Sequence, residues 1–552
     1  MAELGGQPII IIDPDKKRTT GRDAQSMNIT AAKAIAQAVK TTLGPKGMDK
    51  MLVNGVGDVT ITNDGAEILR QIDVQHPAAM MMVEISKTQE KEAGDGTTSA
   101  VVLAGELLTQ AQKLIELEVH PTIIVKGYKL AAEKAQEILE STAINVTKDE
   151  TEVLKKIALT ALSGKGSEMA LDDLATLCVE AIQAIADETE IDIEHNIQII
   201  SQRGGSIKDT RLIKGMVLDK ARAHKNMPKK IDDAKVAVLD VGIEVQRTTT
   251  NSKIKISSPE QMNEAYQEEY QTVKDQVDAL IAAGVNVLVT QKGIDDISLH
   301  YLAKHNILAI RRVSEDDIKK VVRATSATLR SNSMDISPED LGSADLVEER
   351  GMGNYKMLYF EGCENPKAVT IDVHSGADFI TEEVKRALDD ALNVVKVVLD
   401  EGKVMYGGGA PEIEVAMQLR EYASTLSGRE QLAVSAFAEA MEGLPRSLVE
   451  NSGLDHVDIL VKLRSEHNNG NKTVGLNLFT DEVTDMSNTN VVEPLKVKVQ
   501  SIKSAVDAAV MILRVDDVFA SKYTGLMDVD PEHRVDSYDG IQAPSLEEIG
   551  ED

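Results

Sequence analysis

Three apolar, β-branched runs lie in the middle of the sequence, and they constrain its fold more than any other feature. They are VAVLDV at 236–241, VNVLV at 285–289 and ILAI at 307–310, with helical stretches between them. Continuous apolar runs of this length are typical of strands covered on both faces, as in the sheets of α/β proteins. We therefore predict an α/β unit in the centre of the chain.

Both ends of the chain show helical periodicity instead. Residues 28–42 carry apolar side chains on one helical face, and a long buried helix is expected after residue 97. Another stripe covers 384–399 and stops at Gly402, and a further apolar helix is predicted over 503–518. Because 552 residues are too many for one core, we predict a helical domain built from both chain ends, with the α/β unit inserted into it.

The helix predicted over 259–283 has an uneven composition. Ser258 is suited to cap its N-terminus, Pro259 to occupy its first position and Gln261 to complete a capping box. Apolar residues at helical spacing dominate the second half, whereas the first half, EQMNEAYQEEYQ, is mostly polar. The first half is therefore expected to project from its domain.

The amino-acid composition indicates which kinds of partner and which cellular compartment to expect. The 60 basic and 90 acidic residues give a net charge of −30, which argues against nucleic acid because phosphate binding needs clustered Lys and Arg. Two cysteines without metal-site spacing fit a reducing compartment. A signal peptide and an apolar run of about eighteen residues are both lacking, so a soluble, cytoplasmic protein without a membrane partner is expected. The acidic tail is expected to be disordered.

The stretch GDGTTS at 94–99 has the composition of a phosphate site. It opens a helix, whose free N–H groups and dipole attract anions, and its glycines allow close backbone approach. A carboxylate at Asp95 would repel phosphate unless a divalent cation lay between them. Asp95 is therefore interpreted as a Mg²⁺ ligand, with phosphate oxygens and waters completing the shell. The alternative is that Asp95 is a plain helix cap.

The remaining motifs are weak when each is taken alone. TTLGPKG at 41–47 lacks the P-loop pattern, and taken alone it favours a helix stop followed by a turn. The segment TNDG at 62–65 reads as an ordinary strand-to-turn junction, and GGG at 407–409 as a hinge or a close approach to a ligand. Asp390 lies off the apolar stripe of its helix, and the alternative to a functional role is a solvated surface charge.

Taken in order, these motifs resemble those of a group II chaperonin, the family of the archaeal thermosome and its relative, the eukaryotic cytosolic chaperonin. The matching segments include TTLGPKGMDKM, ITNDGAEIL, EAGDGTTSAVVLAGELL, RALDDAL, MYGGGAPEIE and VVEPLKVKVQSIKSAVDAAVMILRVDD. The resemblance covers roughly residues 18–525.

The resemblance implies a multidomain α and α/β chaperonin fold with three domains. The expected ranges are 1–145 and 405–525 for a mainly helical equatorial ATPase domain, 146–213 and 371–404 for an intermediate domain, 214–370 for an inserted α/β apical substrate-binding domain with a helical lid protrusion at about 247–283, and 526–552 for the acidic disordered tail.

The resemblance also implies the functional residues. Asp64 and Asp390 are expected to be catalytic, with Asp390 positioning the attacking water, and Asp95 to hold Mg²⁺. The residues expected to bind ATP are Thr42, Leu43, Gly44, Pro45, Asn63, Gly65, Gly94, Asp95, Gly96, Thr97, Thr98, Ser99, Gly164, Lys165, Gly408, Gly409, Asn477 and Glu493.

The function implied is that of an ATP-dependent molecular chaperone. Hydrolysis of ATP, with Mg²⁺, is expected to close a double-ring chamber with a built-in lid around non-native client proteins. The expected partners are copies of the chain or paralogous subunits in stacked rings, without nucleic acid and without a separate lid co-chaperonin. The alternative is a chaperonin-like scaffold that binds without hydrolysing ATP.

Overall fold

The computed structural model describes residues 17–55, 57–165, 170–186, 192–244, 259–352, 355–364 and 366–520. They divide into two units, which are described separately: residues 17–27 with 515–520, and the described residues of 28–514. In the first unit, β1 (Lys17–Thr20) and β19 (Asp517–Ala520) form an antiparallel two-stranded sheet in which Thr20 lies opposite Asp517. The two ends of the described chain are therefore paired with each other.

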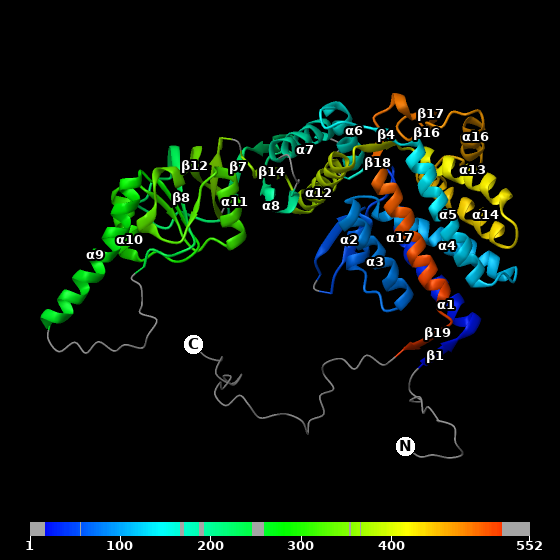
Figure 1. Ribbon diagram of the computed structural model, residues 1–552, viewed down its shortest axis with the longest axis horizontal. Coiled ribbons are helices and arrows are strands. Elements are labelled where there is room, and N and C mark those ends of the chain that lie inside the picture. The colour runs from blue at the N-terminus through cyan, green and yellow to red at the C-terminus, as the bar shows by residue number, and fades with distance from the viewer. Residues whose placement is uncertain are drawn as a thin grey trace, which may run out of the picture. The chain divides into compact units, whose positions relative to one another are not determined.

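Helices dominate the second unit before residue 143 and after residue 409. They are α1 (Gly21–Lys40, in this unit from residue 28), α2 (Gly65–Gln71), α3 (Pro77–Ala93), α4 (Thr97–Glu116), α5 (Pro121–Thr142), α13 (Ala410–Thr425), α14 (Glu430–Met441), α15 (Gly443–Asn451), α16 (His456–Asn468) and α17 (Leu495–Arg514). Figure 1 shows α17 beside α3, α4 and α5, against which it packs. Most of these helices share a mainly aliphatic core, with Leu103, Leu107 and Ile502 among its members, whereas α16 packs in a separate cluster.

Short strands connect these helices. They are the hairpin β2 (Lys50–Val53) and β3 (Val59–Thr62), the hairpin β16 (Val474–Asn477) and β17 (Glu482–Asp485), and β15 (Lys403–Tyr406) between β4 (Ile144–Asn145) and β18 (Val492–Pro494). The last sheet brings together segments from three distant parts of the sequence.

A second group of helices surrounds a small sheet. Its elements are α6 (Thr151–Leu162), α7 (Leu171–Ile185), α8 (Ile193–Asn196), α12 (Asp378–Glu401), β5 (Ile197–Arg203), β6 (Arg211–Ile213) and β14 (Val369–Ser375). Strand β14 lies between β5, to which it is parallel, and β6. Helix α12 packs against α6 and α7, and Gly402, at φ +66°, ends it as predicted.

The central part of the chain forms a seven-stranded sheet. Its strands are β7 (Gly215–Leu218), β8 (Lys230–Leu239), β9 (Val287–Thr290), β10 (Leu308–Ile310), β11 (Leu329–Arg330), β12 (Gly342–Met352) and β13 (Tyr355–Glu361), with helices α9 (Pro259–Ala283), α10 (Asp296–Lys304) and α11 (Glu315–Thr325). Strands β8, β9 and β10 correspond to the three predicted strands, and they are parallel.

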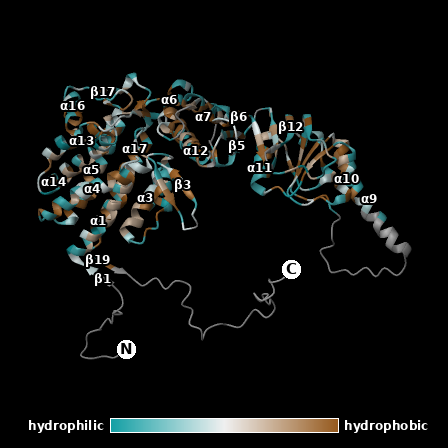
Figure 2. Cartoon of the chain, turned by 180° about the vertical axis from the view of Figure 1, so that it is seen from behind, coloured by the Kyte–Doolittle hydropathy of each residue, from teal (hydrophilic) through white to brown (hydrophobic). Residues whose placement is uncertain are grey.

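Both faces of this sheet are covered. Val236 and Val238 belong to the apolar cluster on one face, whereas Ala237 and Leu239 belong to the cluster on the other face. Figure 2 shows the strands of this sheet as largely hydrophobic. The prediction of an α/β unit is confirmed, but β12 and β13 are antiparallel additions that sequence analysis did not identify.

Helix α9 has the predicted bounds. Val273, Val277 and Leu280 in its second half are buried, whereas Tyr270 is 44 % exposed. In Figure 1 the first half extends beyond α10. Residues 247–258 of the predicted protrusion, Ser258 among them, and the acidic tail at 526–552 lie outside the described residues.

Two predicted helix boundaries are wrong. The helix predicted over 503–518 is α17, which begins at Leu495 and ends at Arg514, because residues 517–520 pair with β1. The helix predicted over 28–42 is α1, which begins at Gly21 and ends at Lys40. No helix among the described residues is both long and apolar enough to cross a membrane.

Candidate functional site

A cavity of about 520 Å³ opens in the second unit between the N-terminus of α4, the loop after α1, the loop before α13 and strand β16. Most of the predicted site residues line it. They are Thr42, Leu43, Gly44, Pro45, Asn63, Asp64, Asp95, Gly96, Thr97, Thr98, Ser99, Lys165, Gly408, Gly409, Asn477 and Glu493. The volume lies in the usual range for small-molecule sites.

The loop after α1 is held in place from the other end of the chain. The Asn451 side chain on α15 donates hydrogen bonds to the carbonyls of Lys40 and Leu43, at 3.0 and 2.9 Å. Gly44 has φ +84°, and a Cβ there would lie 2.5 Å from Leu448. This tight turn presents the backbone of residues 42–45 to the cavity.

The N-terminus of α4 is left free of side-chain caps. Its N-cap is Gly96, at φ +79°, and no side chain accepts a hydrogen bond there. Asp95 instead accepts a hydrogen bond from the Gly96 amide at 2.7 Å. The alternative that Asp95 is a plain helix cap is therefore wrong, and the first-turn amides of α4 remain available to an anion.

A buried glutamine fixes this loop. Gln89 on α3 donates to the carbonyl of Asp95 at 2.8 Å and to that of Val497 on α17 at 3.3 Å. Its side chain thus ties the loop before α4 to the C-terminal helix.

Asp64 has a structural role that the sequence did not indicate. It caps α2 by accepting hydrogen bonds from the amides of Ala66 and Glu67, at 3.2 and 3.0 Å. It also accepts one from the Thr97 hydroxyl at 3.2 Å. The carboxylate is therefore held rigidly at the start of α4.

Lys165 lies between two of the predicted carboxylates. Its Nζ is 2.5 Å from Asp390 Oδ2 and 3.7 Å from Asp95 Oδ1. Burial alone would lower the pKa of Lys165, but Asp390, Asp95 and Asp64 together raise it. Lys165 is therefore a cation in this site.

Asp390 is not a solvated surface charge. Its side chain is 18 % exposed and paired with Lys165, so that alternative is wrong. Burial raises the pKa of Asp390 well above its usual value, with Asp64 and Asp95 adding to the effect and Lys165 opposing it. A carboxylate with a raised pKa is suited to accept a proton near neutral pH.

Four predicted residues lie behind the cavity wall rather than in it: Gly65, Gly94, Gly164 and Asp390. A Cβ at Gly65 would lie 2.5 Å from the Thr98 hydroxyl, and one at Gly94 would lie 2.4 Å from Asn393 on α12. The Gly164 carbonyl accepts a hydrogen bond from Asn63. These glycines allow the loops to pack closely behind the residues that face the cavity.

Comparison with known proteins identifies the family. The model of the TCP-1/cpn60 chaperonin family matches residues 35–523. The chain belongs to this family. It is 53 % identical to thermosome subunit alpha of Archaeoglobus fulgidus, covering 95 % of this chain and 96 % of that protein, and 52 % identical to thermosome subunit beta of the same organism, with the same coverage. It is 52 % identical to the thermosome subunit of Pyrococcus horikoshii, covering 94 % and 95 %.

These relatives place the chaperonin in group II, and its helical and α/β parts agree with the multidomain chaperonin fold. The similarity over nearly the whole chain supports an ATP-dependent chaperone and does not favour a scaffold that has lost hydrolysis.

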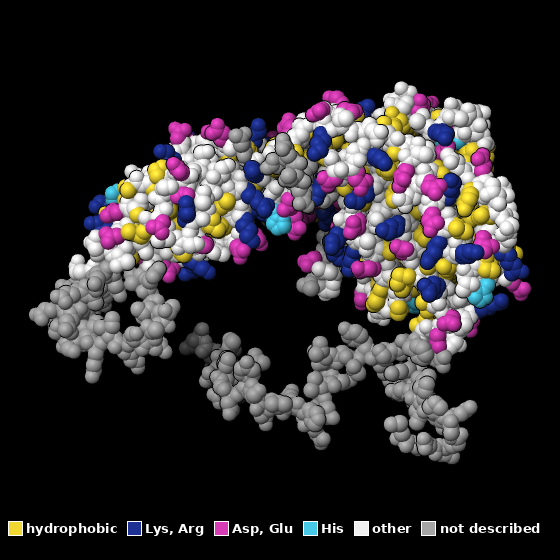
Figure 3. Space-filling view, viewed as in Figure 1, with side chains coloured by type: hydrophobic (Ala, Val, Ile, Leu, Met, Phe, Trp, Pro, Cys, Tyr) yellow, Lys and Arg dark blue, Asp and Glu magenta, His cyan; other side chains and the backbone are white. Residues whose placement is uncertain are grey.

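On the face seen in Figure 3, acidic and basic side chains are intermingled.

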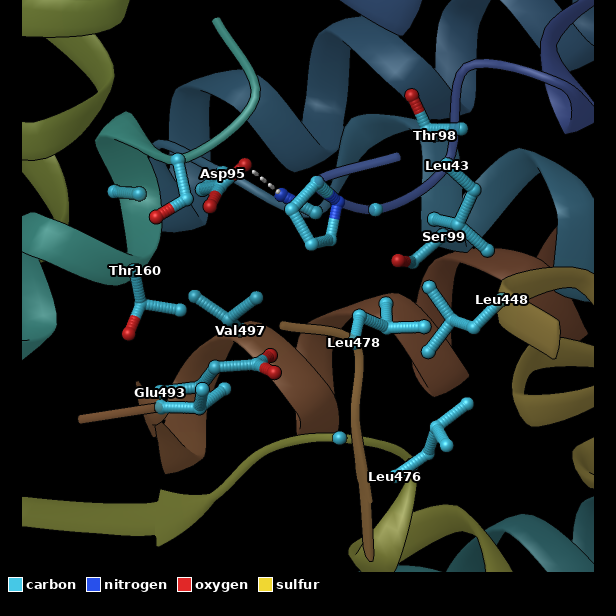
Figure 4. A pocket seen from close by; sticks show the side chains of 18 of the residues that line it. Leu43, Asp95, Thr98, Ser99, Thr160, Leu448, Leu476, Leu478, Glu493 and Val497 are labelled. Carbon is cyan, nitrogen blue, oxygen red and sulfur yellow. Dashed lines mark hydrogen bonds between the residues drawn. The ribbon is translucent and has the colours of Figure 1, made fainter. Parts of the chain in front are cut away.

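The apolar end of the chaperonin's cavity was not predicted from the sequence. Leu444, Leu448, Leu476, Leu478 and Phe479 line it. Figure 4 shows Leu448, Leu476 and Leu478 at one end of the cavity, while Asp95 and Thr160 lie toward the other. No local motif marks these leucines, because α15 and β16 come together only through tertiary packing.

The residues at the polar end fit a Mg²⁺ ion bound together with a phosphate group. Among the described residues, no group of three or more His, Cys, Asp or Glu side chains is arranged to hold a metal by itself. Magnesium usually takes only one or two carboxylates and completes its shell with phosphate and water. Asp64, Asp95 and Asp390 against Lys165 leave two negative charges in excess when all are ionised. A divalent cation would balance them.

Proposed function

We propose that this chaperonin binds Mg·ATP in the cavity described above, hydrolyses it, and uses the resulting change in conformation to enclose and fold non-native proteins. The observation that carries the proposal is the composition of the cavity. An uncapped helix N-terminus with Asp95 and Lys165 lies at one end, and a cluster of leucines lies at the other. A nucleotide has the same polarity, with phosphates at one end and a base at the other.

The polar end suggests a role for each charged group. Asp95 would hold Mg²⁺, which supplies a counter-charge for the phosphates. Asp390 would orient and deprotonate the attacking water, with Asp64 beside the terminal phosphate and Lys165 sensing it. Since Lys165 contacts Asp390 at 2.5 Å and Asp95 at 3.7 Å, occupancy of the phosphate site would change the interactions that hold Asp390.

We propose the three-domain division implied by the family. The hydrophobic clusters support it, because separate clusters gather residues of the terminal helical segments, of residues 146–197 with 369–404 and Val492, and of the seven-stranded sheet with its helices. Asp95 belongs to the first group of segments and Asp390 to the second. Motion of one group relative to the other would therefore assemble or open the catalytic set.

The assembly proposed is a pair of stacked rings in the cytoplasm. The nearly equal identity to alpha and beta thermosome subunits of one organism is compatible with rings of this chain alone or with a paralogous subunit. The first half of α9 is proposed as part of a built-in lid, which would make a separate lid protein unnecessary.

The test measures phosphate release and client refolding together. Purified protein with Mg·ATP should release phosphate and should increase the recovery of a chemically denatured client, and omission of Mg²⁺ should abolish both. Binding of the client without phosphate release would instead establish the non-hydrolysing scaffold.

A further inference from the structure

The hydroxyl of Thr160 joins helix α6 to strand β18 at the edge of the cavity. Thr160 Oγ1 accepts a hydrogen bond from the Val492 amide and donates one to the Asn490 carbonyl, each at 3.1 Å. Thr160 also lines the cavity, and in the view of Figure 4 it lies between Asp95 and Glu493. The hydroxyl proton and one of the two oxygen lone pairs are therefore engaged by backbone groups.

Strand β18 lies where the chain passes between two of the proposed domains. It pairs with β15, and the other neighbour of β15 is β4. Strand β4 ends at the first proposed boundary, after residue 145, and β15 spans the second, after residue 404. A rotation of one domain against the other would be centred near this sheet, because few other residues connect the two domains along the chain. Thr160 attaches α6 to the outer strand of the sheet.

The position of α6 also sets the position of Lys165. Only Ser163 and Gly164 separate Lys165 from the end of the helix. The amide and the hydroxyl of Ser163 both donate to the Leu159 carbonyl, at 3.0 and 2.7 Å, so this residue continues α6. The side chain of Asn63 donates a hydrogen bond to the Gly164 carbonyl. The placement of Lys165 therefore depends on where α6 lies relative to the cavity.

We propose that Thr160 is a positioning residue for ATP hydrolysis. By holding α6 on β18, its hydroxyl keeps Lys165 between Asp95 and Asp390 when the domains move, and it does so without contacting the nucleotide. This inference rests on the proposed function. It goes further because it assigns a role in hydrolysis to a hydroxyl that the motifs did not indicate and whose partners are backbone groups.

Steady-state phosphate release by Thr160→Val tests the proposal, because valine has nearly the same shape but lacks the hydroxyl. The kcat should fall by roughly threefold to tenfold, the effect of losing about one hydrogen bond. The KM for Mg·ATP should stay within about twofold of the wild-type value, because no contact with the nucleotide is lost. Thr160→Ser retains the hydroxyl and should recover most of the loss. An unchanged kcat in Thr160→Val would overturn the proposal, and a raised KM with an unchanged kcat would show that Thr160 binds the nucleotide directly.

Thr176→Val provides a matched control. Thr160 Oγ1 also donates to the carbonyl of Lys156, four residues earlier, at 2.9 Å. Thr176 on α7 makes the same type of bond to the carbonyl of Asp172, at 2.8 Å. The control variant therefore reproduces the loss of the bond within the helix, and its kcat should equal that of the wild type.

Amide hydrogen exchange provides a measurement that does not depend on activity. The Val492 amide should exchange faster in Thr160→Val than in the wild type, and so should the amides of residues 163–165, whereas both should be unchanged in Thr176→Val. Faster exchange at Val492 with unchanged exchange at 163–165 would show that the contact does not place Lys165, and it would overturn the proposal. Absence of phosphate release by the wild type would instead overturn the proposed function, and the exchange pattern would still decide whether Thr160 places Lys165.

Discussion

The ammonium group of Lys165 lies 2.5 Å from the Asp390 carboxylate, and the two residues are 225 positions apart in the sequence. The Lys165 ammonium is also 3.7 Å from Asp95, so one cation is shared by a carboxylate on the cavity wall and a carboxylate behind it. An anion that entered beside Asp95 would compete for this cation. Binding of an anion in the cavity would therefore weaken the ion pair between Lys165 and Asp390, and the Asp390 side chain could then move.

Replacement of Asp390 by Ala should slow ATP hydrolysis strongly while ATP binding is largely retained. Asp390 does not line the cavity, but its raised pKa suits a general base, and such groups are worth about 10²- to 10⁴-fold in rate. Single-turnover phosphate release would measure the effect. Asp389→Ala, one position away on the same helix and exposed, should keep the wild-type rate. Wild-type turnover in Asp390→Ala would disprove the role.

Replacement of Asp95 by Asn should weaken the binding of Mg·ATP by at least about tenfold, since the magnesium ion would lose its protein ligand. In EDTA the substitution should no longer weaken ATP binding. Metal-free ATP should bind the variant as well as the wild type or better, because a negative charge beside the phosphates is gone. Calorimetry in both conditions provides the comparison. Equal losses with and without magnesium would show that Asp95 does not act through a metal.

Glu414 should make the stability of the helical part depend on pH. Its side chain, 8 % exposed, lies 2.9 Å from His467 Nδ1 and 3.3 Å from Lys472 Nζ. Burial would raise the pKa of Glu414, but hydrogen bonds from His467, Gln418 and Lys472 lower it to about 2. Because the pKa of Glu414 is lower in the folded state, its contribution to the free energy of unfolding is fully present above the unfolded-state pKa of about 4.3. This contribution is lost as the pH falls toward 2.

Glu414→Gln should therefore destabilise the protein by about 2 kcal/mol at neutral pH, with the difference shrinking below about pH 4. Urea unfolding of both proteins between pH 7 and pH 3 would measure it. Glu421→Gln, at an exposed position on the same helix, serves as the control and should match the wild type throughout. A difference that stays constant down to pH 3 would contradict the ionic origin of the effect.

Replacement of residues 247–269 by a short Gly/Ser loop should spare ATP hydrolysis but abolish folding of a stringent client. Val273, Val277 and Leu280 in the second half of α9 are buried and are kept by the replacement, and the residues proposed to bind nucleotide lie in other segments. With a transition-state analogue of ATP, a bound client should resist protease in the wild type and be digested in the variant. If the variant still protects the client from protease as the wild type does, α9 does not act as a lid.

Elements with a strong local pattern could be predicted from the sequence. The stripe at 384–399 and its stop at Gly402 identified α12, and the central apolar runs identified three strands, which the structure shows to be parallel. The start of α17 was missed because LKVKVQ at 495–500 alternates apolar and polar residues in the manner of a strand. Packing against α3, α4 and α5 overrides this local preference.

The candidate site was predictable only where short motifs mark it. The two glycines and the single carboxylate of GDGTTS pointed to a phosphate and a metal, and the resemblance supplied Lys165 and Asp390. The leucines of the apolar end, Gln89 behind the Asp95 loop and the Glu412–Lys498 pair carry no local signature. Their placement depends on contacts between segments that are far apart in the sequence, up to 408 positions for Gln89 and Val497, and a single sequence does not reveal such contacts.

The cavity takes its walls from residue 42 through residue 498 of a chain of 552. During synthesis, a nascent chain on the ribosome therefore carries the Asp95 loop long before it carries Glu493 and Lys498. Stabilisation by a bound ligand is available only to a state that contains the whole site. Nucleotide in the cell would thus favour finished subunits over truncated ones, so that binding itself distinguishes a complete chain from a broken one.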